Sequence, residues 1–374
     1  MKIGVIDADL IGKKRHRFPN LACMKIAGYY KSKGNEVELV LDYKDIDMYD
    51  KVFISKVFTD TPVDEEVLKL SHVEYGGTGF FYDKAEPLPY EIEHHMPYYD
   101  LYKDWANEKM EQGIKRNELV YYLDHSIGFT TRGCFRQCSF CVNRNYKKVN
   151  KHSEIEEFLD KDRKYICLLD DNVLGCGEWK NIFKELNETG KRFQFKQGMD
   201  ERLLTKEKCE IILNSNYIGD YIFAFDNIED KELIESKLKI WNKCRKEKGG
   251  TTKFYVFCGF DRNDNYNEEF WKQDIIDTFE RIKILMTYGC LPYIMRHENY
   301  ENSPFRGTYI NLARWCNQPS FYKKKSYREF CQANQDRTKN GICAAMKYLN
   351  ELEEKYPDIA SKYFDMKFEE LKSN

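Results

Sequence analysis

Short apolar runs alternate with helix-like segments over the first third of the chain. The runs that predict strands are residues 2–8, 37–41 and 51–55. A helix is expected from Pro19, with Gly34 as its stop signal, and another over 64–70. Strands that alternate with helices favour a parallel sheet with right-handed crossovers. We therefore expect a small Rossmann-like α/β domain over 1–118, whose last part is a linker with one helix over 99–112.

The same alternation continues from residue 119 to about 300. The runs that predict strands are 126–130, 165–169, 192–196, 221–225, 254–258 and 291–295. The helical patterns between them cover 153–160, 179–189, 206–214, 231–246 and 268–288. Six such strands fall short of the eight βα units of a full TIM barrel. From 301 to the end the pattern is helical, with helices expected over 343–356 and 364–371.

The length of 374 residues indicates two or three domains. Hydrophobic residues make up 42%, which excludes global disorder, and a net charge of −2 gives no general attraction to nucleic acid or membrane. No apolar run approaches the ~20 residues of a membrane span. The 13 cysteines are too irregularly spaced for a disulfide scaffold. We expect a protein of the reducing cytoplasm.

Three of the cysteines stand in one short motif. Cys134, Cys138 and Cys141 form a CxxxCxxC pattern directly after an apolar, strand-like segment. Three thiolates on one loop can hold three irons of a [4Fe-4S] cluster and leave the fourth iron open to a small molecule. An open iron suggests reaction at the cluster, whereas four protein ligands would suit electron transfer.

Zinc and chance are the alternatives for these cysteines. A structural zinc site usually takes four protein ligands, and no second CxxC-like half is present. His125 or His152 could complete a Cys3His site, but neither has the spacing of a zinc knuckle. Chance does not explain the Thr-Arg-Gly sequence before the first cysteine or the aromatic Phe140 before the third.

The motif resembles that of the radical S-adenosylmethionine (SAM) superfamily, in which an aromatic residue such as Phe140 commonly precedes the third cysteine. The resemblance implies a partial (β/α)6 barrel over 119–300 and a helical C-terminal segment over 301–374. It also implies that the amine and carboxylate of SAM chelate the open iron. One electron, from a partner such as flavodoxin or ferredoxin, would cleave SAM to methionine and a 5′-deoxyadenosyl radical, which abstracts hydrogen from a substrate.

Polar residues follow the next two expected strands. The resemblance implies that Asp170, Asp171 and Asn172 contact the amine of SAM, although Asp and Asn also favour turns and helix caps. Gln197 and Arg202 could contact the carboxylate of SAM or the substrate, because a guanidinium suits a carboxylate. A salt bridge between Arg202 and the nearby Asp200 is the alternative.

The last three strand ends carry further candidates. Asp226 lies where the family often has a polar residue near the ribose, and Gly259 would let the backbone approach the adenine. Arg296 points to the barrel mouth, where we expect it among the cofactor-binding residues without a defined contact. No residue is assigned a catalytic role.

The first domain resembles the cobalamin-binding-type domain that precedes the barrel in many radical SAM enzymes. The family's DxHxxG motif, which supplies the histidine ligand of cobalt, is absent from the segment 7–16. The glycine-rich run 76–79 is as well explained by a tight turn. We therefore do not expect cobalamin, and cobalamin-dependent methylation is the alternative reaction. The alternative from another class is a non-catalytic iron–sulfur or zinc protein.

The substrate is left open between a small molecule, a peptide and nucleic acid. Basic residues interleaved with aromatic ones could grip nucleic acid; they are Arg314, Trp315, Phe321, Tyr322, Lys323, Lys324, Lys325 and Arg328. One basic run in a chain of net charge −2 is more often a solvated face. The spacing of Cys316, Cys331 and Cys343 suits no compact binding loop, so we expect a single cluster.

Overall fold

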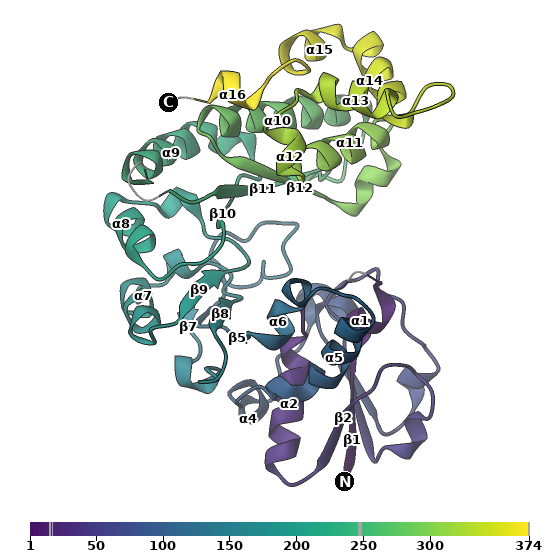
Figure 1. Cartoon of the computed structure of the whole chain (residues 1–374), viewed down its shortest axis with the longest axis vertical. Helices are drawn as coiled ribbons and strands as arrows, with labels where there is room; N and C mark the ends of the chain where they lie inside the picture. The colour runs from purple at the N-terminus through teal and green to yellow at the C-terminus, as the bar shows by residue number, and fades with distance from the viewer. Residues whose placement is uncertain (15, 17, 246–248, 373–374) are drawn as a thin grey trace. The chain divides into compact units, whose positions relative to one another are not determined.

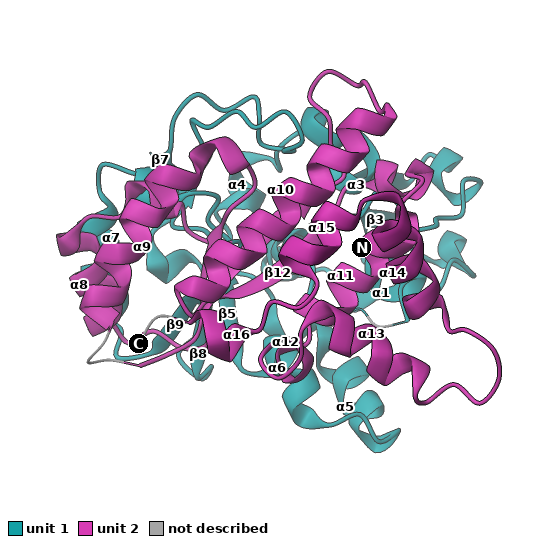
Figure 2. Ribbon diagram, turned by 90° about the horizontal axis from the view of Figure 1, so that it is seen from above, with its two compact units in different colours: residues 1–197 teal, residues 198–374 magenta. Residues whose placement is uncertain are grey.

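The computed structural model describes residues 1–14, 16, 18–245 and 249–372, in a mixed α/β fold with parallel sheets (Figure 1). It divides into two compact units, Met1–Gln197 and Gly198–Asn374, which are coloured separately in Figure 2. The boundaries expected near 118 and 300 stay predictions. No helix in the described part of the chain is long and apolar enough to cross a membrane.

The first sheet of unit 1 is parallel and has the strand order β2-β1-β3-β4. Its strands are β1 (Lys2–Asp7), β2 (Glu36–Leu39), β3 (Lys51–Ser55) and β4 (Val73–Gly76). Helix α2 (Leu21–Ser32) packs on β1, β2 and β3. The side chain of Asn20 caps this helix by accepting from the N–H of Cys23, and Gly34 has φ +78° just past its end.

The segment expected as a linker is part of the core of unit 1. Tyr99 and Tyr102 are 6% and 1% exposed, and they belong to the same buried cluster as Ile3 and Val5 of β1. The helix expected over 99–112 is present as a 3-10 turn, Tyr99–Tyr102, that continues into α5 (Lys103–Glu111). The other short helices of the first 124 residues are α1 (Ala8–Gly12), α3 (Thr78–Phe81), α4 (Tyr90–Glu93) and α6 (Val120–Leu123).

A second parallel sheet completes unit 1, with the order β5-β8-β9. Its strands are β5 (His125–Gly128), β8 (Tyr165–Leu168) and β9 (Arg192–Phe195), and α7 (Trp179–Glu188) lies between the last two in sequence. Two short antiparallel strands, β6 (Thr131–Arg132) and β7 (Asn150–Lys151), enclose the cysteine motif. All three strands of this sheet lie within three residues of their expected bounds.

Unit 2 contains a third parallel sheet, β10-β11-β12, and a helical C-terminal part. The strands are β10 (Tyr221–Ala224), β11 (Thr252–Cys258) and β12 (Leu291–Arg296). The helices among them are α8 (Lys206–Asn214), α9 (Lys231–Arg245) and α10 (Glu268–Thr287), and residue 246 of the helix expected over 231–246 lies outside the described residues. The C-terminal helices are α11 (Arg306–Cys316), α12 (Pro319–Tyr322), α13 (Tyr327–Gln335), α14 (Ala344–Lys355), α15 (Pro357–Tyr363) and α16 (Phe368–Leu371).

Two expected helices are reduced to single 3-10 turns, so those predictions were wrong. In 64–70, only Val67–Lys69 is helical, because the Asp64 carboxylate forms a local turn with the N–H of Glu66 at 3.0 Å. In 153–160, only Ile155–Glu157 is helical, and the carbonyl of Phe158 accepts from the hydroxyl of Tyr99 at 2.6 Å. The remaining 3-10 turns are Ile46–Met48, Tyr82–Lys84, Arg116–Glu118, Val173–Gly175, Glu201–Leu203, Ile228–Asp230 and Glu298–Asn302.

Candidate functional site

The cysteine loop, residues 133–143, leaves the β6 strand through a backbone turn that requires glycine. Gly133 has φ +94°, and a Cβ added there would lie 2.5 Å from the carbonyl oxygen of Lys148. Gln137, between the first two cysteines, also has positive φ, +50°. The thiols of Cys134, Cys138 and Cys141 are all half-buried. The loop therefore presents three accessible sulfurs from a constrained backbone.

Nitrogen donors surround the sulfurs of this loop. The Sγ of Cys134 accepts from the backbone N–H of Arg136 at 3.5 Å and from the Nδ2 of Asn172 at 3.4 Å. The Sγ of Cys141 accepts from the backbone N–H of Asn143 at 3.4 Å. Such donors favour the thiolate, and hydrogen bonds to the sulfurs tune the reduction potential of an iron–sulfur cluster. Asn172 thus donates a hydrogen bond to a cysteine sulfur, a contact that the sequence did not predict.

Asp170 is a buried anchor for the chain that enters the loop. It is 1% exposed, and its Oδ1 accepts from the Thr130 hydroxyl at 2.6 Å and from the Thr131 N–H and hydroxyl at 2.6 and 2.7 Å. Its Oδ2 accepts from the N–H of Thr130 at 3.1 Å. Burial raises the pKa of Asp170 to about 6, although these hydrogen bonds lower it. These hydrogen bonds satisfy both oxygens of Asp170 without any ligand. Contact between Asp170 and SAM stays a prediction.

Asp171 holds both ends of the cysteine loop. Its Oδ2 accepts from the backbone N–H of Gly133 at 2.7 Å, and its Oδ1 accepts from the Nδ2 of Asn143 at 2.7 Å. These two residues flank the motif, one directly before Cys134 and the other two residues after Cys141. Burial raises the pKa of Asp171, and the bond from Gly133 lowers it. We call this pair of bonds the Asp171 clamp.

The first domain also contacts the loop. The hydroxyl of Tyr82 donates to the carbonyl of Phe140 at 2.6 Å, and Asp83 forms an ion pair with Arg144 at 2.8 Å. The glycine-rich run that precedes this contact is explained by packing, because a Cβ on Gly77 would lie 2.4 Å from the carbonyl oxygen of Lys56. The domain therefore supports the loop beside the residue that the resemblance singled out, Phe140.

The two histidines considered as a fourth zinc ligand have polar neighbours of their own. Within residues 1–14, 16, 18–245 and 249–372, no three His, Cys, Asp or Glu side chains gather closely enough to hold one metal ion. The His125 Nδ1 lies 3.1 Å from the Val120 carbonyl, and the His152 Nδ1 lies 2.9 Å from the Ser153 hydroxyl. A zinc ion would need its ligands to converge, whereas each cysteine of a cluster binds a different iron. The Cys3His alternative therefore has no support in the geometry.

The remaining predicted site residues lie in or next to unit 2. Gln197 is the last residue of unit 1. Arg202 is held by Asp200 and Asp230, each at 2.8 Å, so the salt bridge considered as an alternative is present. Asp226 accepts from the N–H of Phe257 at 3.1 Å.

The last two candidates of unit 2 have local contacts as well. Gly259 has φ +79° and donates its N–H to Asp274 at 2.9 Å, and the guanidinium of Arg296 lies 4.3 Å from the ring centroid of Tyr300. Contact of any of these residues with a cofactor stays a prediction.

Two residues of unit 2 were missed by sequence reasoning. Arg281 is 2% exposed and donates to the carbonyl oxygens of Phe225, Asp226 and Phe257, which ties the ends of β10 and β11 together. Glu201 is 1% exposed. The only sequence signal for Glu201 was its place in the polar run that follows β9.

Polar side chains fill the carboxyl end of the first sheet between β1 and β3. The Tyr102 hydroxyl donates to Asp7 at 2.9 Å and accepts from the N–H of Asn20 at 3.1 Å. The Nδ2 of Asn20 donates to the Ser55 hydroxyl at 3.0 Å. Burial raises the pKa of Asp7 to about 7. In open α/β sheets ligands bind at this point, where the strand order reverses. Here the chain's own groups bond to one another.

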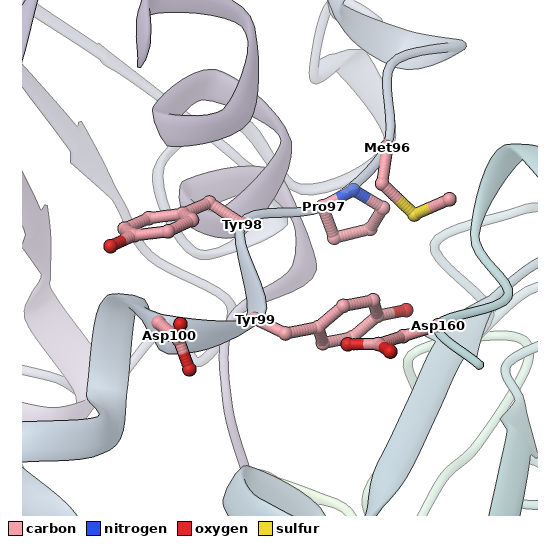
Figure 3. A pocket seen from close by; sticks show the side chains of 6 residues that line it. All are labelled: Met96, Pro97, Tyr98, Tyr99, Asp100 and Asp160. Atoms are coloured by element: carbon pink, nitrogen blue, oxygen red, sulfur yellow. The ribbon is translucent and has the colours of Figure 1, made fainter. Parts of the chain in front are cut away.

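A cavity of about 330 Å³ lies elsewhere in unit 1 (Figure 3). It is lined by Met96, Pro97, Tyr98, Tyr99, Asp100 and Asp160. Figure 3 shows the Tyr99 ring directed toward Asp160, and its hydroxyl accepts from the N–H of Ile127 at 2.8 Å. None of the predicted site residues lines this cavity.

Several of the C-terminal residues considered for nucleic acid are buried or form ion pairs within the protein. Trp315 and Tyr322 are fully buried, so they cannot stack on bases. Arg328 pairs with Glu353 at 2.8 Å and with Asp365 at 3.0 Å. Of the aromatic residues considered, only the half-buried Phe321 is left for stacking, and nucleic acid as a substrate stays untested.

The C-terminal cysteines have packing roles. Cys316 and Cys331 are buried, and burial raises the pKa of Cys331 to about 12. The Sγ of Cys343 accepts from the N–H of Met346 at the start of α14. Both observations fit thiols that pack or cap without metal.

Comparison with known proteins gives a likeness in fold. No family model and no curated protein matches the chain. A similar solved structure is the radical SAM methyltransferase TsrM from Kitasatospora setae with cobalamin and a [4Fe-4S] cluster bound. The TM-score is 0.53 at 12% identity, over 79% of this chain and 74% of TsrM. TsrM with tryptophan substrate and the SAM analogue aza-SAM gives a TM-score of 0.51 at 12% identity, over 78% and 72%.

The likeness covers most of both chains, and TsrM is a radical SAM enzyme that binds cobalamin. It gives no support to the expectation that cobalamin is absent. It does confirm, at the level of the fold, the resemblance read from the cysteine motif: this chain has the α/β fold of radical SAM enzymes.

Proposed function

We propose that this protein is a radical SAM enzyme. The observation that carries the proposal is the cysteine loop, whose three half-buried sulfurs are fixed by the Asp171 clamp. Cys134, Cys138 and Cys141 would hold a [4Fe-4S] cluster. When bound, the cluster supplies one electron for the cleavage of SAM to methionine and a 5′-deoxyadenosyl radical.

The chain's own part in this reaction is to hold and shield the cluster. Asp170 and Asp171 order the backbone on both sides of the motif, so that the thiolates are positioned before the cluster binds. The N–H donors to Cys134 and Cys141 stabilise negative charge on sulfur. Tyr82 covers the Phe140 side of the loop. The electron would come from a reducing protein such as flavodoxin or ferredoxin.

The barrel is part of the same proposal. The two three-stranded parallel sheets, β5-β8-β9 and β10-β11-β12, would be the halves of a partial (β/α)6 barrel. From β8 onward the strands alternate with α7, α8, α9 and α10, as a βα repeat requires, whereas the connection from β5 to β8 carries the cysteine loop and a single 3-10 turn. The polar strand ends of such a barrel would meet the cofactor and the substrate.

A test is SAM cleavage by the anaerobically reconstituted protein. With dithionite as reductant, we expect 5′-deoxyadenosine and methionine in equal amounts, which chromatography measures. The variant with Cys134, Cys138 and Cys141 all changed to Ala should form neither product. A wild-type protein that holds zinc without sulfide, or that holds iron and never cleaves SAM, would favour the non-catalytic alternative.

Cobalamin-dependent methylation is the second candidate, favoured by the likeness to TsrM, which binds cobalamin. A cofactor bound at the carboxyl end of the first sheet, beside β1 and β3, would have to displace the Tyr102 side chain, whose hydroxyl donates to Asp7. Gel filtration after incubation with hydroxocobalamin separates the two candidates. Retention of one equivalent of cobalamin would support methylation, and none would support SAM cleavage without it.

A further inference from the structure

Among the described residues, Glu201 has the one carboxyl with a buried oxygen that lacks a hydrogen-bond partner. The residue is 1% exposed, and within the part of the chain that the structure describes its Oε1 has no hydrogen-bond partner. Its Oε2 accepts a long hydrogen bond, 3.4 Å, from the N–H of Ala224. Leaving a buried polar oxygen in this state costs free energy. The position therefore needs an explanation beyond packing.

The charges around Glu201 do not balance it. Burial raises the pKa of Glu201 well above its usual range, and the neighbouring carboxylates of Asp200 and Asp226 raise it further. Arg202 lowers this pKa, but its guanidinium is already bonded to Asp200 and Asp230. Arg202 pairs with Asp200 and Asp230, and Arg281 lowers the pKa of Asp226, which leaves Glu201 as the acid of this group without an ion pair among the described residues.

The place of Glu201 in the fold is one where ligands bind. It opens the 3-10 turn Glu201–Leu203 and lies beside Ala224, the last residue of β10. Ligands of parallel α/β folds bind at the carboxyl ends of the strands. Ala224 and Asp226 are half-buried, so this strand end is partly exposed to solvent around the buried carboxyl.

We propose that Glu201 binds a positively charged group of a ligand at the carboxyl end of β10. Such a group would give the carboxyl the partner that it lacks. SAM offers this chemistry through its sulfonium, and an amine-bearing substrate offers it through its ammonium group. The SAM source rests on the function proposed above.

The experiment compares the cluster-loaded wild-type protein with Glu201→Gln, which keeps the shape and removes the charge. Glu210→Gln, an exposed position on α8, is the matched control. Equilibrium dialysis measures binding of SAM and of S-adenosylhomocysteine, which lacks the sulfonium charge. We expect Glu201→Gln to weaken SAM at least tenfold. Loss with SAM alone identifies the sulfonium, and equal loss with both compounds overturns the proposal, because S-adenosylhomocysteine carries no sulfonium charge.

If neither compound is affected, L-lysine and spermidine are tested in the presence of SAM. Weaker binding of either amine to Glu201→Gln than to wild type supports a substrate source, and no change in any arm overturns the proposal. Iron and sulfide are measured in the same samples. Missing iron in wild type counts against the proposed function, whereas normal iron with unchanged binding counts only against Glu201.

A second measurement uses only the wild-type protein, so that the proposal can still be tested if Glu201→Gln does not fold. Equilibrium dialysis of wild type alone then compares each cationic compound with a neutral analogue, S-adenosylhomocysteine for SAM and norleucine for lysine. Tighter binding of the cationic member of either pair supports the proposal, and equal binding in both pairs overturns it.

Discussion

Replacing Asp171 tests whether the residues after β8 order the cysteine loop or bind SAM. In Asp171→Ala, the N–H of Gly133 and the amide of Asn143 each lose a charged acceptor at 2.7 Å. A hydrogen bond to a charged group contributes about 1.5–3 kcal/mol. Because both donors lie near the surface and regain water, we take the lower end, about 3 kcal/mol for the pair. At 1.4 kcal/mol per factor of ten, this weakens cluster binding about 100-fold.

Asp171→Asn gives a graded second point. The amide oxygen of Asn can keep one of the two bonds, while its NH2 group faces the other donor. The expected loss is about 1.5 kcal/mol, or roughly tenfold. Asp162→Ala, an exposed carboxylate near the start of β8, is the control and should have no effect.

The assay is retention of iron and sulfide after anaerobic reconstitution and dialysis against increasing concentrations of a chelator. Thermal unfolding of the apo-proteins checks that the fold is intact. As the chelator concentration rises, Asp171→Ala should lose its iron first and Asp171→Asn next, while wild type and Asp162→Ala still keep theirs. An Asp171→Ala protein that keeps full iron but no longer binds SAM would refute the clamp and restore the contact implied by the resemblance.

Three further predictions follow from buried groups. The Cys134, Cys138 and Cys141 triple Ala variant should hold essentially no iron, and iron at the level of a second cluster would assign metal to the C-terminal cysteines. Gly128→Ala would place a Cβ 2.3 Å from the Phe158 ring and should cost about 1–3 kcal/mol in urea unfolding, whereas Gly177→Ala, with open space around it, should cost little. Burial lowers the pKa of His152 to about 4, below its usual value of about 6.5. Between these two pH values the unfolded chain binds a proton at His152 that the folded protein does not, so the free energy of unfolding falls by about 3 kcal/mol as pH decreases. His152→Gln should be correspondingly less acid-sensitive than wild type in urea unfolding at pH 7 and 4.5, and equal sensitivity would contradict this assignment.

The sequence by itself located most of the strands and the cysteine motif. All six strands expected between 119 and 300 are present within three residues of their predicted bounds, and α8 and α10 begin where they were expected. Apolar periodicity is a local property that burial of one face imposes on each element, so it can be read without knowing the neighbours. The CxxxCxxC motif is local too, since its three thiols lie on one loop.

Only the tertiary structure decided what the polar residues of the site do. Asp170 and its partners Thr130 and Thr131 are about 40 residues apart in the chain, and Tyr102 meets Asp7 across 95. Sequence patterns indicate that a carboxylate follows a strand, but not which distant donor it will accept from. The burial of Glu201 and the loss of the helix over 153–160 have the same origin. Contacts between distant segments set desolvation and hydrogen bonding there, and these override the local preference of each residue.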